Sequence, residues 1–111
     1  MAKRGPWIRE SDDVTDSSAK TYDFYVLYTA DGYFYGGYSD DAIRRFHVHE
    51  SGKGAKFTRV KSRHPLRLIY YVTFDSKHDA MHAEATFKKL SRAKKEAFLV
   101  EHGVPSSLWT K

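Results

Sequence analysis

The chain has 111 residues, enough for one domain with a single core and too few for two. Aromatic residues make up 15% of it, which is typical of a globular protein and not of a disordered one. The absence of cysteine excludes disulfides, thiolate metal sites and cysteine nucleophiles. No apolar run approaches the roughly 20 residues of a membrane span, and Met1–Arg4 is not followed by an apolar signal core, so we expect a cytoplasmic protein with no membrane partner.

The net charge of +5 is unevenly distributed along the chain. Residues 1–43 carry four Lys or Arg against eight Asp or Glu, whereas residues 44–111 carry fifteen against six. The stretch 44–67 is the most basic, and Glu50 is its one acidic residue. Such a block favours a polyanionic partner, most simply nucleic acid, although a solvated basic face explains the charge equally well.

The first part of the chain predicts a tail followed by a hairpin. Residues 1–20 are polar and lack a sustained period, so we predict a flexible tail there. The aromatic and β-branched run 22–29 predicts a strand. The pair Asp31-Gly32 predicts a hairpin turn, because glycine accepts positive φ, and the return strand covers 33–38.

A helix is predicted after this hairpin. The segment 39–41 offers N-cap side chains for a helix that begins near Ala42 and ends around Ser51. We expect Ile43 and Phe46 on its inner side and a mobile basic loop after it.

The rest of the chain predicts one more strand and two helices. The segment 66–74 is the strand, with every second side chain from Leu66 on one face. Ser76 and Ser91 each offer an N-cap, and the last helix stops at Gly103. We therefore predict an α+β fold: one small domain with a three-stranded, mostly antiparallel sheet flanked by helices, in the order β-β-α-β-α-α.

Several side chains suited to phosphoryl chemistry are predicted to meet on one hollow. Tyr35 on the return strand can lie near Tyr25 if the hairpin register is tight. Arg45 and His49 are four residues apart and so stack on one helix face. Glu84 is a carboxylate beside an apolar helix stripe, where an unpaired charge is costly.

These residues occur within segments that resemble a known family. "DFY" (23–25) and "YGG" (35–37) correspond to two signature triplets, and "RRFHVH" to an Arg-x-x-x-His helix. With "SGKGAKFTR", "LIYY" and "FKKLSRAKKEAFL" in the same order, the chain resembles the GIY-YIG nuclease superfamily, specifically its small stand-alone bacterial type. We assign the GIY-YIG-like domain to residues 21–103 and a C-terminal tail to residues 104–111.

The resemblance implies a metal-dependent endonuclease that hydrolyses DNA with Mg²⁺ or Mn²⁺. It implies a catalytic set of Tyr25, Tyr35, Arg45, His49 and Glu84, with Glu84 the sole protein metal ligand. Tyr25 would act as general base, its pKa lowered by Arg45 and the metal, and His49 would bond a tyrosine or a phosphate. DNA of undetermined strandedness is the expected partner, with no obligate protein partner, and the expected backbone contacts are Lys53, Lys56, Arg59 and Lys88.

Other interpretations of the same residues stay open. Tyr25 and Tyr35 also suit an aromatic core, Arg45 and His49 a surface pair, and Glu84 an ion pair with Lys88 at i+4. The corresponding alternative functions are a non-catalytic nucleic-acid-binding module that retains the fold, and an RNA nuclease.

Overall fold

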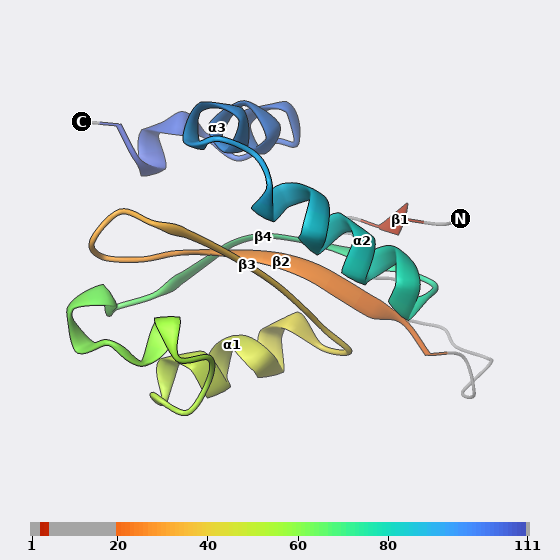
Figure 1. Ribbon diagram of the computed structural model, residues 1–111, viewed down its shortest axis with the longest axis horizontal. Helices are drawn as coiled ribbons and strands as arrows, with labels where there is room; N and C mark the ends of the chain where they lie inside the picture. The colour runs from red at the N-terminus through yellow and green to blue at the C-terminus, as the bar shows by residue number, and fades with distance from the viewer. Residues whose placement is uncertain (1–2, 5–19, 111) are drawn as a thin grey trace.

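The computed structural model describes residues 3–4 and 20–110 as a sheet with helices on both faces (Figure 1). The predicted strands are present as an antiparallel set: β2 (Tyr22–Tyr28), β3 (Phe34–Ser39) and β4 (Arg67–Phe74). One face carries α1 (Ala42–Glu50), and the other carries α2 (Lys77–Lys88) and α3 (Arg92–Glu101). The predicted fold class and element order are confirmed.

Local hydrogen bonds set the element boundaries, as predicted. The side chains of Asp41, Ser76 and Ser91 each accept a backbone N–H in the first turn of the helix that follows. Gly32 in the hairpin turn has φ +91°, and Gly103 at the end of α3 has φ +93°, conformations that L-residues with a side chain rarely adopt.

A two-residue strand extends the sheet to four strands, in the order β1-β4-β2-β3. This strand, β1 (Lys3–Arg4), pairs antiparallel with Phe74 and Thr73 of β4. Pairing on an open edge uses only backbone groups, so no side-chain pattern predicts it. The flexible tail predicted for residues 1–20 is therefore wrong at these two residues, while residues 5–19 lie outside the described part of the chain.

The side chains of β2 alternate between two hydrophobic cores. Phe24 and Val26 pack with α2 and α3, where the Phe24 and Phe87 rings lie 5.5 Å apart. Tyr25 and Leu27 pack on the α1 face. One face of β2 therefore packs in the larger core, and the other face carries Tyr25, which is available to line a site.

In β4, every second side chain from Leu66 does not stay on one face of the sheet, contrary to the prediction for residues 66–74. Val26 pairs with Tyr70, but the next residue, Leu27, pairs with Leu68, so β4 has one extra residue at this point. Such a bulge reverses the alternation of side chains. The even-numbered side chains before it, Leu66 and Leu68, therefore pack on the α1 face, whereas those after it, Tyr70, Val72 and Phe74, pack on the face of α2 and α3.

The buried face of α1 also differs from the prediction. Ile43 is 47% exposed, whereas Ala42 and His49 are buried and Phe46 is half-buried. Positions i, i+4 and i+7 form one helical stripe, and Ile43 lies beside that stripe. The burial of a histidine instead of an isoleucine is the first structural sign of a functional cleft.

The C-terminal segment packs on the domain and is not a tail. Val104 is buried in the larger core, and Ser106–Leu108 form a 3₁₀ helix, η4. The Trp109 ring then meets the Phe34 ring edge-on at 5.2 Å. The tail predicted for residues 104–111 is therefore wrong through residue 110, because Val104 is buried and Trp109 partly buried within it.

Candidate active site

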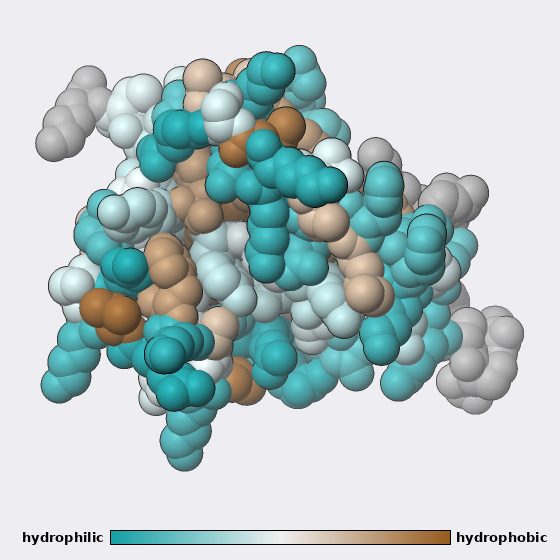
Figure 2. Space-filling model, in the orientation of Figure 1, coloured by the Kyte–Doolittle hydropathy of each residue, from teal (hydrophilic) through white to brown (hydrophobic). Residues whose placement is uncertain are grey.

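A cleft of about 590 Å³ lies at the β3 edge of the sheet, where α1 approaches from one face and α2 from the other. Its lining includes all five residues predicted to be catalytic, namely Tyr25, Tyr35, Arg45, His49 and Glu84. Figure 2 views the molecule from the side shown in Figure 1, and hydrophilic side chains dominate this surface. Sequence positions separated by up to 59 residues, from Tyr25 to Glu84, thus meet on one cleft.

The hairpin brings two phenols to the same wall. Tyr25 pairs with Gly37 and Tyr35 with Leu27, so the two tyrosines are diagonal neighbours on one face. Their ring centroids lie 5.9 and 5.4 Å from that of His49. A Cβ at Gly37 would stand 2.5 Å from the Tyr25 hydroxyl oxygen, so glycine is required for the phenol to reach this position.

His49 is 2% exposed and has a partner on each ring nitrogen. Its Nε2 lies 2.9 Å from the Tyr25 hydroxyl oxygen, and its Nδ1 lies 2.7 Å from Thr58 Oγ1. Tyr25 is one of the two kinds of partner that the sequence leaves open for His49. Gly54 packs against the imidazole, since a Cβ there would stand 2.3 Å from Nδ1, so this part of the predicted mobile loop is in close contact with His49.

Burial controls the protonation of these groups. It raises the pKa of the Tyr25 phenol, the neighbouring Tyr35 raises it further, and Arg45 offsets the effect only in part. Arg45 thus acts in the predicted direction without outweighing burial, and the predicted lowering of this pKa by Arg45 together with a metal stays a prediction. Burial, with a smaller contribution from Arg45, lowers the pKa of His49 to about 4. At neutral pH a protonated phenol thus faces an uncharged imidazole.

The free energy of unfolding is expected to fall as the pH drops from 6.5 to about 4. Between these values the unfolded chain protonates His49 and the folded chain does not, so stability rises with pH in this window and is fully present above it. The linkage amounts to about 3 kcal/mol when fully developed. Chemical denaturation at about pH 7 and about pH 4.5 should show this loss in wild type and a smaller one in His49→Gln. Equal losses in both proteins would contradict the assignment.

Glu84 lines the cleft from α2 with its side chain 20% exposed. Its Oε2 also lies 3.2 Å from Lys88 Nζ. The ion pair considered from the sequence is therefore present, and it coexists with a carboxylate that faces the cleft. Ion pairs between side chains this exposed contribute about 0–1 kcal/mol to the free energy of unfolding. Glu84 can therefore readily exchange Lys88 for another cation.

The donor set fits one hard divalent cation. Among residues 20–110 no group of three or more His, Asp and Glu side chains could hold a metal. Mg²⁺ accepts a single carboxylate when waters and a substrate phosphate complete its shell, and Mn²⁺ accepts the same oxygen donors. Glu84 supplies such a carboxylate beside two phenols and a guanidinium.

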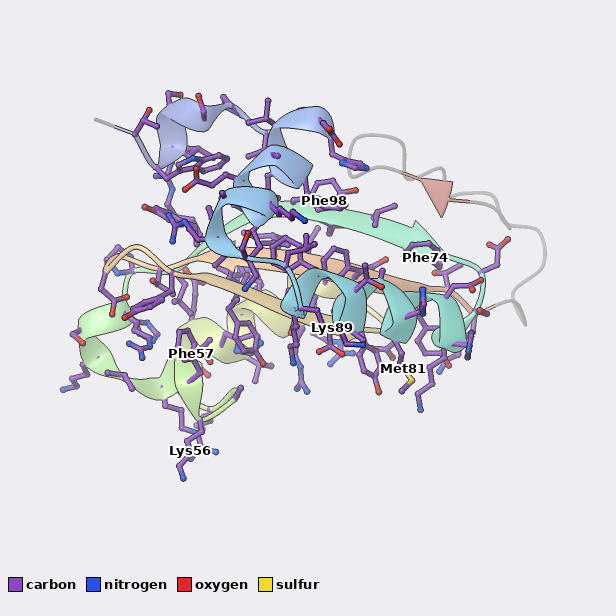
Figure 3. All side chains as sticks on the ribbon, turned by 45° about the horizontal axis from the view of Figure 1, so that its top comes forward. Lys56, Phe57, Phe74, Met81, Lys89 and Phe98 are labelled. Carbon is purple, nitrogen blue, oxygen red and sulfur yellow. The ribbon has the colours of Figure 1, made fainter. Side chains whose placement is uncertain are left out.

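The four residues predicted to contact the nucleic-acid backbone lie at different distances from the cleft. Lys53 lines the cleft, but Lys56, Arg59 and Lys88 do not. Arg59 lies in η2 (Phe57–Arg59), the first of two 3₁₀ helices before β4, the second being η3 (Lys61–Arg63). Figure 3 shows Lys56 extending away from the body of the domain.

Three further residues contribute to the site. Arg44 and Lys77 line the cleft, and Arg44 contacts Asp40. Asp23 is buried, and its carboxylate accepts hydrogen bonds from Ala42 N at 2.8 Å and Thr73 Oγ1 at 2.7 Å. It thus ties the start of α1 to the sheet. Arg44 belongs to the basic block visible in the sequence, but no local pattern singles out Lys77 or Asp23.

Known proteins share this chain's sequence and fold. A model of the GIY-YIG catalytic domain matches residues 21–97. The chain is 54% identical to a UPF0213 protein of Limosilactobacillus reuteri, over 78% of this chain and 91% of that protein. It is 52% identical to a UPF0213 protein of Lacticaseibacillus paracasei, over 78% and 96%. A solution NMR structure of a UPF0213 protein from Bacillus halodurans has 42% identity and a TM-score of 0.52, covering 82% of this chain and 99% of that one.

The helices α1, α2 and α3 are 9, 12 and 10 residues long. Across the described residues, none is both long enough and apolar enough to span a bilayer.

Proposed function

This chain belongs to the GIY-YIG family, and we propose that it is a metal-dependent endonuclease that hydrolyses phosphodiester bonds in DNA. The family is of the nuclease type, which implies a nucleic-acid substrate. The observation that supports the finer assignment is the convergence of two phenols, an imidazole, a guanidinium and a carboxylate on one cleft. A cytoplasmic location and the absence of an obligate protein partner belong to the same proposal.

Each side chain has a distinct role in this proposal. Tyr25 activates the attacking water, with neutral His49 behind it as its hydrogen-bond partner, and Tyr35 orients the water or a phosphate oxygen. Arg45 offers a planar fork of donors to charge that develops on the phosphoryl oxygens. Glu84 would hold Mg²⁺ or Mn²⁺, which when bound polarises the phosphoryl group.

The proposed hydrolysis balances with water as the only co-reactant. The water oxygen forms a bond to phosphorus, and the bond from phosphorus to the leaving oxygen breaks. The proton lost by the water passes to Tyr25 as the phenol proton passes to His49. The leaving oxygen takes up a proton from solvent, to which His49 then releases its own. One water is consumed for each bond cleaved.

The proposal is tested by cleavage of a substrate panel. Labelled single-stranded, duplex and branched DNA and single-stranded RNA are each incubated with the protein in Mg²⁺, in Mn²⁺ and in EDTA. We expect metal-dependent cleavage of at least one DNA. Cleavage confined to RNA would make the protein an RNA nuclease, and binding without cleavage in any metal would make it a binding module. The Glu84–Lys88 ion pair is the observation that favours this last alternative.

Loss of Lys53 is expected to weaken binding to every nucleic-acid sequence alike. Lys53 is exposed at the cleft, where an ammonium can neutralise one backbone phosphate and release its counterion. Lys53→Ala should therefore reduce the slope of log affinity against log salt by about one unit. The matched control is Lys94→Ala, which removes an exposed lysine from α3 on the opposite face of the sheet. Equal slopes for wild type and both variants would leave Lys53 as a solvated lysine. Lys56, Arg59 and Lys88 stay predicted contacts, testable in the same way.

Arg45→Lys is expected to keep binding and lose turnover. Lysine retains the positive charge but not the planar fork of donors. Because developing phosphoryl charge exists mainly in the transition state, the rate should fall by about 10²–10³-fold, as when an oxyanion-hole donor is removed. Single-turnover rates and metal-free affinities measure the two effects separately. Equal losses of rate and affinity would mean that Arg45 only binds.

A further inference from the structure

The hydroxyl of Thr58 lies on the far side of His49 from Tyr25. Thr58 is 0% exposed and comes from η2, outside every segment predicted to carry a catalytic residue. We infer that Thr58 is a positioning residue, whose hydroxyl holds His49 in the tautomer that is protonated on Nδ1 and so leaves Nε2 to accept the proton of Tyr25. The inference about the reaction rests on the proposed function, whereas the tautomer itself does not.

The hydrogen-bond network around Thr58 favours this tautomer. Thr58 Oγ1 lies 3.0 Å from the carbonyl oxygen of Ala55, which can only accept, so the single hydroxyl proton is donated there. With its proton directed to Ala55, the same oxygen accepts in its 2.7 Å contact with His49 Nδ1. Nδ1 carries the ring proton, and in the uncharged ring Nε2 carries a lone pair.

The other end of the imidazole completes the assignment. Nε2 lies 2.9 Å from the Tyr25 hydroxyl oxygen, and with its lone pair it accepts the phenol proton. The Tyr25 oxygen then keeps its own lone pairs as acceptors, for the Arg45 guanidinium that hydrogen-bonds it and for a proton from water. The opposite tautomer would donate from Nε2 to that oxygen and would leave no base behind the phenol.

Thr58 is held in place from several directions. Its backbone carbonyl accepts a hydrogen bond from His64 Nε2 at 2.7 Å, and its backbone N–H is bonded to Ala55 O at 3.0 Å. The neighbouring Phe57 ring stacks on Tyr35 at 5.7 Å, and the Arg63 guanidinium covers Phe57 at 3.9 Å. The hydroxyl therefore has a fixed position relative to both tyrosines of the cleft.

A fixed tautomer makes the proton transfer directional. As the water adds to phosphorus, its proton moves to the Tyr25 oxygen while the phenol proton moves to Nε2. The resulting imidazolium keeps its Nδ1–H bond to Thr58, so no ring rotation or proton exchange is needed. Histidines whose second nitrogen is fixed by a hydrogen bond serve as oriented bases in the same way.

The tautomer is measured on the full-length protein by long-range ¹H–¹⁵N NMR at neutral pH. The chain has six histidines, and the His49 signals are identified by their loss in His49→Gln. We expect a protonated Nδ1 and an unprotonated Nε2 in wild type. The reverse assignment, or rapid exchange between the two forms, would overturn the inference without any activity measurement.

Two substitutions then test the role of the hydroxyl. Thr58→Val keeps the shape and removes the acceptor, so His49 should shift toward the Nε2–H form. The cleavage rate should fall by about 10–10²-fold, the usual cost of losing the partner of an oriented histidine, with little change in KM. Thr58→Ser keeps the hydroxyl and should restore both the NMR signature and the rate. The control Thr29→Val removes an equally buried hydroxyl, one bonded to Tyr33 N at the hairpin and not in the cleft, and should change neither.

The outcomes separate this inference from the proposed function. Thr58→Val with an unchanged His49 signature, or Thr58→Ser with the signature and rate of Thr58→Val, would overturn the role of Thr58. A wild-type protein with the expected tautomer and no nuclease activity would overturn the proposed function and leave the tautomer assignment standing.

Discussion

Cleavage by Tyr25→Phe is expected to be about 10²–10⁴-fold slower than cleavage by wild type, the range that one positioned proton-transfer group contributes. The phenol is buried, and phenylalanine retains its ring in the same packing on the α1 face. Only the hydroxyl is lost, and with it the 2.9 Å contact to His49 Nε2. Affinity for nucleic acid should therefore change little while the single-turnover rate falls.

The matched control is Tyr28→Phe, which removes a phenol from the same strand on the opposite face. It should cleave like wild type. Near-wild-type cleavage by Tyr25→Phe would show that the hydroxyl takes no part in the reaction and that Tyr25 is a core aromatic residue.

Glu84→Gln is expected to abolish metal-dependent cleavage and leave the fold intact. The amide matches the carboxylate in shape but is a far weaker ligand for Mg²⁺ or Mn²⁺. The variant also loses the exposed ion pair with Lys88, which contributes only about 0–1 kcal/mol to the stability. Titration with Mn²⁺ should show binding to wild type and none to the variant, and this readout does not depend on activity.

Glu96→Gln is the control for this substitution. Glu96 lies on α3 and makes a comparable i+4 ion pair with Arg92, away from the cleft. It should keep both metal binding and cleavage. Full Mg²⁺-dependent activity in folded Glu84→Gln would exclude Glu84 as the metal ligand and leave it as the partner of Lys88.

Most of the fold could be predicted because its boundaries are set by local chemistry. Asp41, Ser76 and Ser91 cap helices through side chains that bond a neighbouring backbone N–H, and such contacts are visible within four residues of sequence. The predictions failed where contacts between segments distant in the sequence determine the structure. The bulge in β4 is a matter of register with β2, and Trp109 is ordered by Phe34 of the hairpin.

The candidate site followed from periodicity for similar reasons. Hairpin pairing predicted Tyr35 near Tyr25, and helical spacing predicted Arg45 on the same helix face as His49. The depth of His49 and the rotation of α1 were not predictable, because they depend on partners far along the chain. Asp23, in the first signature triplet, bonds Ala42 and Thr73, which lie 19 and 50 residues further along the chain.

The most direct test of a metal-dependent nuclease site in this cleft compares three purified proteins: wild type, Tyr25→Phe and Glu84→Gln. Each is mixed in excess with the substrate that the panel shows to be cleaved fastest, in Mg²⁺ and in EDTA, and cleavage and binding are recorded together. We expect cleavage by wild type in Mg²⁺ alone, with all three proteins binding the substrate about equally. Equal cleavage by all three proteins, or binding without cleavage by wild type, would contradict the proposed site.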